Sequence, residues 1–229
     1  MNTICIKGDL YMKTRDIIEE IFNAITHGLG IILSIIGLVL MLHQVITHNK
    51  DSLYILSAII YGLSLIFMYS MSTFYHSFFC LPTVSRIFKI LDHAAIYILI
   101  AGTDTPVLLT VLRHYHGLAI AIIIWIVALI GVLWQCFNVH KFKKLATLCY
   151  VLMGWLLVGT LPILWIHLSP QAVIWLLVGG LWYTLGAIFY LWKKLPFQHL
   201  IWHFFVLGGS ICHFYAMYHY VLLASPILL

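Results

Sequence analysis

The chain has 229 residues, 63% of them hydrophobic and only 8% charged, and its mean hydropathy is +1.05. Soluble domains carry about 25% charged residues, so this composition excludes an ordinary water-soluble protein. The formal net charge of +5 does not indicate a nucleic-acid partner, because no hydrophilic domain carries the basic residues. The sequence also indicates neither a soluble partner nor an oligomeric state.

Seven apolar runs are each long enough to cross a bilayer, which takes about 20 residues. None alternates with a period of two, which argues against a β-barrel, and the short connections are typical of a helical bundle. The sequence predicts an all-α polytopic membrane protein, with a short tail at residues 1–17 and a seven-helix transmembrane domain at residues 18–229. The predicted spans are Ile18–Leu42, Leu53–Phe78, Ile87–Leu112, Tyr115–Phe137, Leu145–Ile166, Ala172–Leu191 and Leu200–Leu223.

Cysteines and prolines add two expectations. The five cysteines are scattered and form no CxxC pair, so the sequence predicts neither a disulfide framework nor a thiolate zinc site. Pro106 and Pro162 lie inside predicted spans, where a missing N–H group is expected to kink the helix.

The lysines and arginines predict how the chain is oriented. Ten of the twelve lie in the N-terminal tail and in the loops after the second, fourth and sixth spans, which share one side of the membrane. Only Lys50 and Arg113 lie on the other side. Because short basic loops stay in the cytoplasm, the N-terminus is expected to be cytoplasmic and the C-terminus outside.

Ionisable side chains inside membrane helices are costly, so each one is a candidate functional residue. With this topology, polar residues of four spans lie about 5–15 Å below the cytoplasmic face at 1.5 Å per residue. Their common depth predicts one polar pocket near that face. The residues are Glu20, Asn23 and His27 of "EEIFNAITHGLG", Ser72 and His76 of "STFYH", Asp92 and His93 of "LDHAAIY", and His199 and His203 of the seventh span.

Three of these histidines have the spacing of a metal site. His199 and His203 are four residues apart and share a helix face, and His76 lies at the same depth. Three neutral imidazoles with an open position form a catalytic zinc arrangement, and Asp92 could orient the water or take its proton. Buried histidines can also hydrogen-bond across helices without metal, or relay protons together with an aspartate, so both alternatives stay open.

Two further polar residues lie deeper in the membrane. His213 follows His199 by fourteen residues, close to four helical turns, so it shares the face of His199 but lies about 15 Å deeper than His203. It is better explained as pocket lining than as a ligand. Asp104, deep in the third span, could pair with His213 or mark a polar path across the membrane.

Four segments carry a resemblance to a known family. "EEIFNAITHGLG", "STFYH", "LDHAAIYILIAGTDTP" and "HLIWHFFVLGGSICHFYAM" resemble the signature blocks of the bacterial hemolysin III family. This family is the prokaryotic branch of the progestin and adipoQ receptors, within the CREST group of membrane hydrolases. The resemblance implies seven helices with the N-terminus inside. It also implies a Zn²⁺ ion held by His76 of an SxxxH motif and by His199 and His203 of an HxxxH motif.

The resemblance also implies roles for residues around the metal. Asp92 matches the aspartate that holds the zinc-bound water, and Ser72 matches the serine of SxxxH. Asp104 in "GTDTP" departs from the family, whose members usually have tyrosine there, so the pocket shape of relatives is not transferred to this chain. The other candidate pocket or supporting residues are Glu20, Asn23, His27, His93, Asp104 and His213.

Three functions remain open from the sequence. The first is a zinc-dependent intramembrane hydrolase that acts on an amide or ester of a membrane lipid, with Asp92 as base and Ser72 hydrogen-bonding the water or the oxyanion. The second is a sensor, receptor-like or transport protein of membrane homeostasis with structural zinc. The third is a cytolysin, for which the sequence offers no amphipathic insertion segment. In each case a multi-pass protein of the bacterial plasma (inner) membrane is expected.

Overall fold

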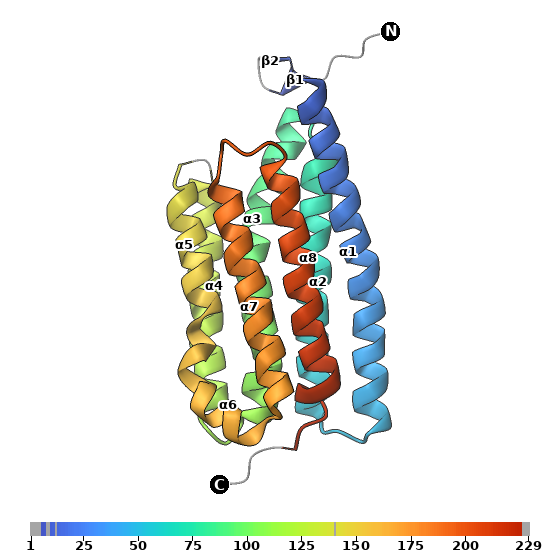
Figure 1. The fold of residues 1–229 in the computed structure, drawn as a ribbon, viewed down its shortest axis with the longest axis vertical. Helices are drawn as coiled ribbons and strands as arrows, with labels where there is room; N and C mark the ends of the chain where they lie inside the picture. Colours follow the sequence, from blue (N-terminus) through green and yellow to red (C-terminus); the bar gives the residue numbers. More distant parts are fainter. Residues whose placement is uncertain (1–5, 8–9, 12, 140, 226–229) are drawn as a thin grey trace.

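The computed structural model describes residues 6–7, 10–11, 13–139 and 141–225. In this part of the chain, seven helical segments are long and apolar enough to cross a membrane, which confirms the predicted number. The segments run side by side along one long axis, and the first begins at the end of the bundle opposite to that where the last one finishes (Figure 1).

The helices follow the predicted apolar runs closely. The first begins at Thr14, inside the predicted tail, and is preceded by a short antiparallel hairpin of two-residue strands, β1 (Ile6–Lys7) and β2 (Leu10–Tyr11). The helices are α1 (Thr14–Thr47), α2 (Ser52–Ser77), α3 (Pro82–Pro106), α4 (Gly117–Asn138), α5 (Lys143–Gly154), α6 (Leu161–His167), α7 (Pro170–Leu191) and α8 (Gln198–Ala216).

Three spans depart from a regular α-helix. The third ends at Pro106 and continues as a π-helical segment, η1 (Val107–Val111), and the last continues as a second one, η3 (Met217–Val221). The fifth is broken into α5, a 3₁₀ segment η2 (Leu156–Thr160) and α6, with Pro162 in the first turn of α6. A proline cannot donate the hydrogen bond that continues an α-helix, and the helix changes form at both predicted positions.

The third span lies at the centre of the bundle. In its most apolar window 83% of the residues are buried, whereas only 17% are buried in the fifth span. Large apolar side chains cover the outer faces of the helices, as in Ile32 of α1 and Ile130 of α4, which are 57% and 61% exposed. Such faces match the hydrocarbon core of a bilayer, which solvates apolar side chains and requires the backbone to be bonded internally.

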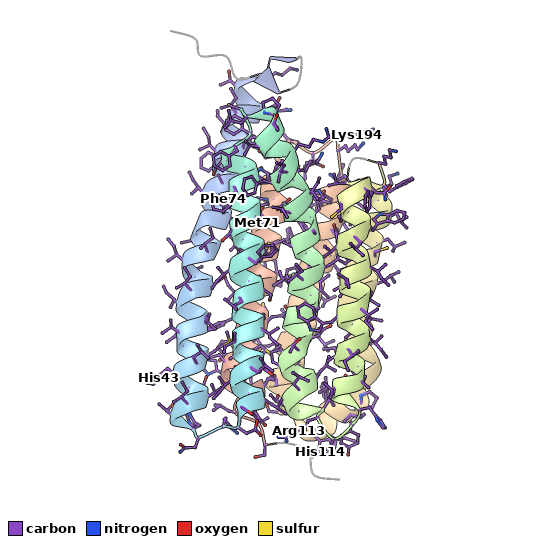
Figure 2. All side chains as sticks on the ribbon, turned by 180° about the vertical axis from the view of Figure 1, so that it is seen from behind. His43, Met71, Phe74, Arg113, His114 and Lys194 are labelled. Carbon is purple, nitrogen blue, oxygen red and sulfur yellow. The ribbon has the colours of Figure 1, made fainter. Side chains whose placement is uncertain are left out.

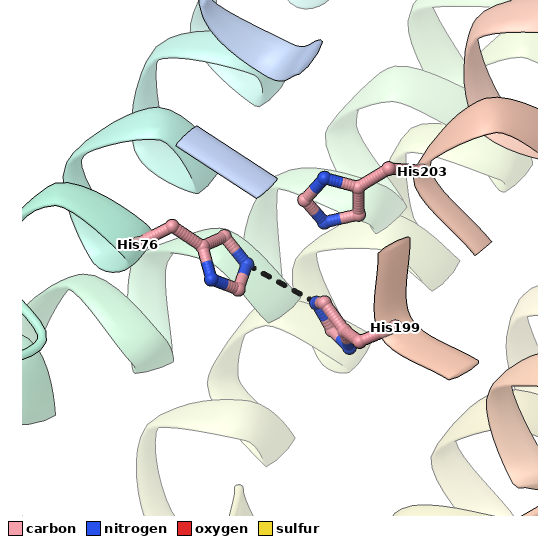
Figure 3. A group of neighbouring side chains, drawn as sticks. All are labelled: His76, His199 and His203. Atoms are coloured by element: carbon pink, nitrogen blue, oxygen red, sulfur yellow. Dashed lines mark hydrogen bonds between the residues drawn. The ribbon is translucent and has the colours of Figure 1, made fainter. Parts of the chain in front are cut away.

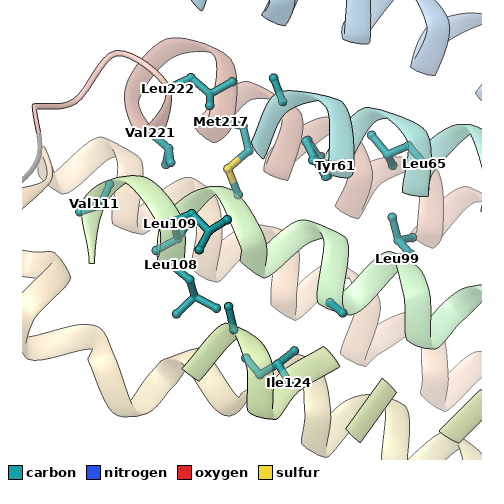
Figure 4. Packing of buried hydrophobic residues seen from close by; sticks show 14 of the residues in the cluster. Tyr61, Leu65, Leu99, Leu108, Leu109, Val111, Ile124, Met217, Val221 and Leu222 are labelled. Carbon is teal, nitrogen blue, oxygen red and sulfur yellow. The ribbon is translucent and has the colours of Figure 1, made fainter. Parts of the chain in front are cut away.

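Apolar packing closes the end of the bundle where α8 finishes. Leu108 of η1, Ile124 of α4 and Met217 of η3 are at most 1% exposed and meet there (Figure 4). The two π-helical segments contact each other within this cluster. The histidine cluster described below lies at the end of α2 and the start of α8, toward the opposite end of the bundle. Lys194 lies at that opposite end, away from His43 and Arg113 (Figure 2).

Polar contacts tie the loop between α1 and α2 to neighbouring segments. Lys50 Nζ donates to the carbonyl oxygens of Leu223 (2.7 Å) and Ala224 (3.0 Å), and Tyr54 Oη donates to Ala224 O (2.8 Å). Arg113 donates to Asp51 Oδ2 at 2.6 Å. Burial by itself raises the pKa of Asp51, but the hydrogen bonds from Arg113 and from the backbone outweigh it, so the pKa lies below its ordinary value.

The Tyr54 hydrogen bond should contribute measurably to stability. Tyr54→Phe keeps the buried ring and removes the hydroxyl, so it should cost about 1 kcal/mol and lower the thermal midpoint in detergent by a few degrees. Tyr115→Phe is the matched control, because the Tyr115 hydroxyl has no hydrogen-bond partner among the described residues. Equal midpoints for Tyr54→Phe and the wild type would show that this bond contributes nothing.

One cysteine differs from expectation. Cys80 is disulfide-bonded, although the cysteine spacing predicts no disulfide framework. Cys136, Cys149 and Cys212 are free. Spacing along the chain reveals a disulfide only where cysteines form a recognisable pattern, and the cysteines of this sequence form none.

Candidate metal centre and its cavity

Three histidines converge where the last turn of α2 meets the first two turns of α8. His76, His199 and His203 each offer one ring nitrogen, and these three atoms lie within 4.8 Å of one another. The rings face a common point from two helices, and Nε2 of His76 lies 3.1 Å from Nε2 of His199 (Figure 3). His76 and His203 are buried, at 2% and 1% exposure.

A carboxylate selects the tautomer of the His76 ring. Nδ1 of His76 donates to Oε2 of Glu20 at 2.6 Å, and a carboxylate can only accept. The proton of the neutral ring is therefore on Nδ1, which leaves the lone pair of Nε2 directed at His199. A carboxylate behind a histidine is a frequent arrangement around protein-bound metals, where it orients the ring and raises its basicity.

A hydroxyl fixes His203 in the same way. Thr26 Oγ1 directs its own proton to the carbonyl oxygens of Phe22 (2.9 Å) and Asn23 (3.0 Å). Its oxygen therefore accepts from Nδ1 of His203 at 3.2 Å. Nε2 of His203 is left with a lone pair, like that of His76.

These nitrogens fit a tetrahedral metal ion. Two nitrogens bound at about 2.0–2.1 Å with tetrahedral angles lie about 3.3 Å apart, close to the 3.1 Å between His76 and His199. The three ligand nitrogens lie within 4.8 Å of one another, so the His203 ring would move slightly inward to complete the tetrahedral spacing. Imidazole ligands suit zinc, copper, iron and nickel, so the donor set is compatible with Zn²⁺, which stays a prediction.

Further residues of α1 support the cluster. The ring of His27 stacks on that of His203, with centroids 3.5 Å apart and planes at 7°. Glu19 Oε1 accepts a hydrogen bond from the backbone N–H of His199 at 3.2 Å. This carboxylate satisfies one of the free N–H groups in the first turn of α8, where Phe197, with φ of 55°, supplies no side-chain cap.

A second polar network surrounds Asp92 on α3. Nδ1 of His93 donates to the carbonyl oxygen of Lys89 at 2.9 Å and also lies 3.1 Å from Oδ2 of Asp92. Nε2 of His93 is 3.1 Å from the hydroxyl of Tyr190 on α7. Tyr150 of α5 donates to the carbonyl oxygen of His93 at 3.0 Å. Three helices thus hold the Asp92 region in place, and the Asp92 side chain is only 10% exposed.

An apolar cavity joins the two networks. It contains about 1040 Å³ of space not filled by atoms, part of it open to the outside, and His199, His203, Asp92 and Ser72 all line it. Most of its wall is apolar and comes from α3, α5, α7 and α8. From Asp92 to Asp104, which also lines it, the rise along α3 is about 18 Å at 1.5 Å per residue. The cavity is therefore long enough for an extended aliphatic chain.

The deep polar residues do not bond to each other. His213 Nε2 contacts the carbonyl oxygen of Leu176 at 3.0 Å, while Nδ1 of His213 and Oδ2 of Asp104 find no hydrogen-bond partner among the described residues. Both residues line the cavity, as the shared face of His199 and His213 predicts. Of the expected pocket residues, Asn23 is buried at 2% exposure, one turn before His27, and does not line the cavity.

Removing the charge behind His76 should weaken metal binding. Glu20→Gln keeps the size of the side chain but loses the carboxylate that accepts from Nδ1, so metal affinity should fall about tenfold to a hundredfold. Competition with a calibrated chelator measures the affinity of the purified protein. Asp16→Asn, an exposed acid on the same helix, is the control. An unchanged affinity in Glu20→Gln would argue against a metal on His76.

Comparison of the sequence with known proteins identifies the family of this chain. The sequence model described as haemolysin-III related matches residues 15–214, which include all three histidines. The chain belongs to this family. The family and the seven apolar helices together indicate a multi-pass membrane protein.

Individual relatives of the haemolysin III family extend from bacteria to mammals. Hemolysin-3 of Bacillus cereus is 46% identical over 209 residues, covering 91% of this chain and 94% of the relative. The Hemolysin-3 homolog of Bacillus subtilis (strain 168) is 44% identical over 203 residues, covering 88% and 94%. The human monocyte to macrophage differentiation factor is 30% identical over 213 residues, covering 89% and 84%.

Proposed function

We propose that this haemolysin III family member is a zinc-dependent hydrolase that cleaves an amide or ester bond of a membrane lipid. The observation that carries the proposal is the position of the buried histidine cluster at the wall of a long apolar cavity inside a membrane-spanning bundle. Such a cavity favours an aliphatic chain, and the histidine cluster then lies beside the polar end of that chain.

The chain's own residues account for binding and proton transfer in this proposal. His76, His199 and His203 would hold the ion, which would supply Lewis acidity to a carbonyl group and to water. Asp92 lines the same cavity and takes the proton of the attacking water, then returns it to the leaving amine or alcohol. Ser72, 1% exposed on the cavity wall, donates a hydrogen bond to the oxyanion that develops at the carbonyl.

The network behind Asp92 has a positioning role. The His93 ring lies 3.1 Å from one oxygen of the Asp92 carboxylate and is itself held by the Lys89 carbonyl oxygen and the Tyr190 hydroxyl. A carboxylate positioned in this way needs little rearrangement during the reaction. Such preorganisation of polar groups is the main source of electrostatic catalysis. Apolar walls also keep bulk water away from the bond that is broken.

A lipid panel tests the proposed activity. Purified, zinc-loaded protein in lipid nanodiscs should release fatty acid from at least one class of lipid amide or ester, and His203→Ala should abolish the release. Protein that retains its zinc but turns over none of the amides and esters would contradict the hydrolase. The same preparation would then support the sensor or transport role with structural zinc.

We also propose that the N-terminus is cytoplasmic, in the bacterial plasma membrane. Ten of the twelve lysines and arginines belong to the segments at the α1 end of the bundle, where Lys194 lies (Figure 2), and basic loops are retained in the cytoplasm. Cysteines introduced singly at Lys194 and His114 test this orientation with a membrane-impermeant thiol reagent. Labelling of the Lys194 position in intact cells would contradict it.

A second candidate function, cytolysis, is suggested by the name of the Bacillus cereus relative. It makes a different prediction, because a cytolysin must act on membranes that it does not already span. Purified protein added from outside at nanomolar concentration would lyse erythrocytes if cytolysis were its function. Lysis seen only on overexpression inside a host cell would contradict that function.

A further inference from the structure

The deep end of the cavity holds polar groups that the proposed reaction does not use. Asp104 is 6% exposed, and its Oδ2 has no hydrogen-bond partner in the described part of the chain. Nδ1 of His213 also lacks a partner there, although Nε2 of the same ring is held by Leu176 O at 3.0 Å. Buried polar groups are otherwise almost always hydrogen-bonded, so two at the deep end of one cavity, away from His27 and the histidine cluster, require an explanation.

Packing keeps the His213 ring in place beside the cavity. Its Nε2 bond to the backbone of α7 fixes one edge, and a methyl group at Gly179 would overlap the ring. The ring of Tyr183 lies 5.5 Å away, centroid to centroid. His213, which lines the cavity, is therefore held by α7 through Nε2, while its Nδ1 has no partner among the described residues.

We propose that Asp104 and His213 form a second recognition site, which binds a hydroxyl group carried by the aliphatic chain of the ligand. Nε2 of His213 donates to the Leu176 carbonyl oxygen, so Nδ1 of the neutral ring is an acceptor. A hydroxyl can donate its proton to Nδ1 while its oxygen accepts from the protonated carboxyl group of Asp104. A plain alkyl chain would bury both groups unpaired. A site that hydrogen-bonds a hydroxyl discriminates strongly against the analogue lacking it for that reason.

The rise along the helices determines at which position of the ligand's aliphatic chain this hydroxyl lies. Asp104 is twelve residues beyond Asp92, and His213 is ten beyond His203, which gives about 15–18 Å at 1.5 Å per residue. An extended chain advances about 1.2 Å per bond, so the hydroxyl lies about 12 to 15 bonds from the group at the histidine cluster. The inference rests on the proposed function only in assigning the polar head of the ligand to that cluster.

Binding of matched fatty acids tests the site without requiring catalysis. A brominated fatty acid in the cavity should quench Trp155 and Trp202, which line it, and test ligands then displace it from the purified, metal-loaded chain. The ligands are tetradecanoic acid and 14-hydroxytetradecanoic acid, with the twelve- and sixteen-carbon pairs. The hydroxylated fourteen-carbon acid should bind about tenfold to a hundredfold more tightly than its plain partner. The preference should fall in the sixteen-carbon pair, because its hydroxyl lies about 16 bonds from the carboxyl carbon and therefore beyond this range. The twelve-carbon pair, at the near edge of the range, should keep part of the preference.

Variants assign the preference to these residues. Asp104→Leu should reduce it at least tenfold, while Asp104→Asn, which keeps a hydrogen-bonding group and the shape, should retain part of it. Thr103→Val is the matched control, because the Thr103 hydroxyl lines the same cavity but donates to Leu99 O at 2.7 Å. All variants are measured in the same micelle, so differences in ligand partitioning cancel.

The outcomes separate this inference from the hydrolase. Equal affinity of the two fourteen-carbon acids for the wild type, or an unchanged preference in Asp104→Leu, overturns the second site even if the protein hydrolyses lipids. A preference that depends on Asp104 supports the site even if no lipid is hydrolysed, because the readout is displacement and not turnover.

Discussion

Purified His203→Ala should contain almost no zinc, whereas the wild type should contain about one ion per chain. If the total free energy of about 10–16 kcal/mol for a structural zinc site is shared among its ligands, losing one costs roughly 3–5 kcal/mol, or about two to four powers of ten in affinity. His76→Ala and His199→Ala should behave alike, because the three nitrogens form one cluster. Metal analysis after gel filtration in detergent measures the content.

His43→Ala is the control for these variants. His43 is exposed at the far end of the bundle (Figure 2), so its removal should leave the zinc content unchanged. Folding is checked separately through the thermal midpoint of each variant in excess zinc and in chelator. Full zinc content in His76→Ala and His199→Ala would mean that the ion is held elsewhere.

Asp92→Asn should lower the rate of lipid hydrolysis by about 10²–10⁴ while leaving the zinc content unchanged. The amide has the size of the carboxylate but cannot take a proton from water. The measurement is release of fatty acid at saturating substrate, together with the metal content of the same sample. The separation of rate from metal content identifies Asp92 as a proton acceptor and not as a ligand.

Two comparisons make this result specific. Asp16→Asn, an exposed acid at the start of α1, should have the wild-type rate. His93→Gln removes the ring that lies beside Asp92 Oδ2 and should lower the rate less than Asp92→Asn, because the base is still present. Zinc lost together with the rate in Asp92→Asn would make Asp92 a ligand, and an unchanged rate would remove it from the reaction.

The seven spans could be predicted from the sequence because a single physical requirement determines them. Each span needs about 20 apolar residues with its backbone bonded internally, and the last predicted span, Leu200–Leu223, differs from the observed Gln198–Val221 by two residues at each end. The break in the fifth span was predicted only as a kink at Pro162. The 3₁₀ segment before it depends on packing that no local pattern reveals.

The grouping of His76, His199 and His203 was also predictable, because loop charge and helical rise give depth, and i, i+4 spacing gives a common face. The residues behind them were not fully predictable. Thr26 and Glu19 contact the cluster through the rotation of α1 against α8, and helix rotation follows from side-chain packing along the whole interface. Glu20 was expected near the pocket, but its bond to His76 is visible only in the structure.

The deep residues show the same limit. Helical spacing predicts that His213 shares the face of His199, and both residues line the cavity. The alternative that Asp104 pairs directly with His213 is not observed in the described atoms, since His213 bonds to the backbone of α7 instead. A periodic pattern gives the face and depth of a polar group but not its partner, which depends on the neighbouring helices.

X-ray absorption at the zinc edge of the purified wild-type protein tests the central claim most directly, because it reports the ligands of the ion itself. We expect one zinc per chain, bound by three imidazole nitrogens and one oxygen of a water molecule, all at about 2.0–2.1 Å. Absence of zinc, a sulfur ligand at about 2.3 Å, or a fourth ligand supplied by the protein would contradict a three-histidine site with an open catalytic position.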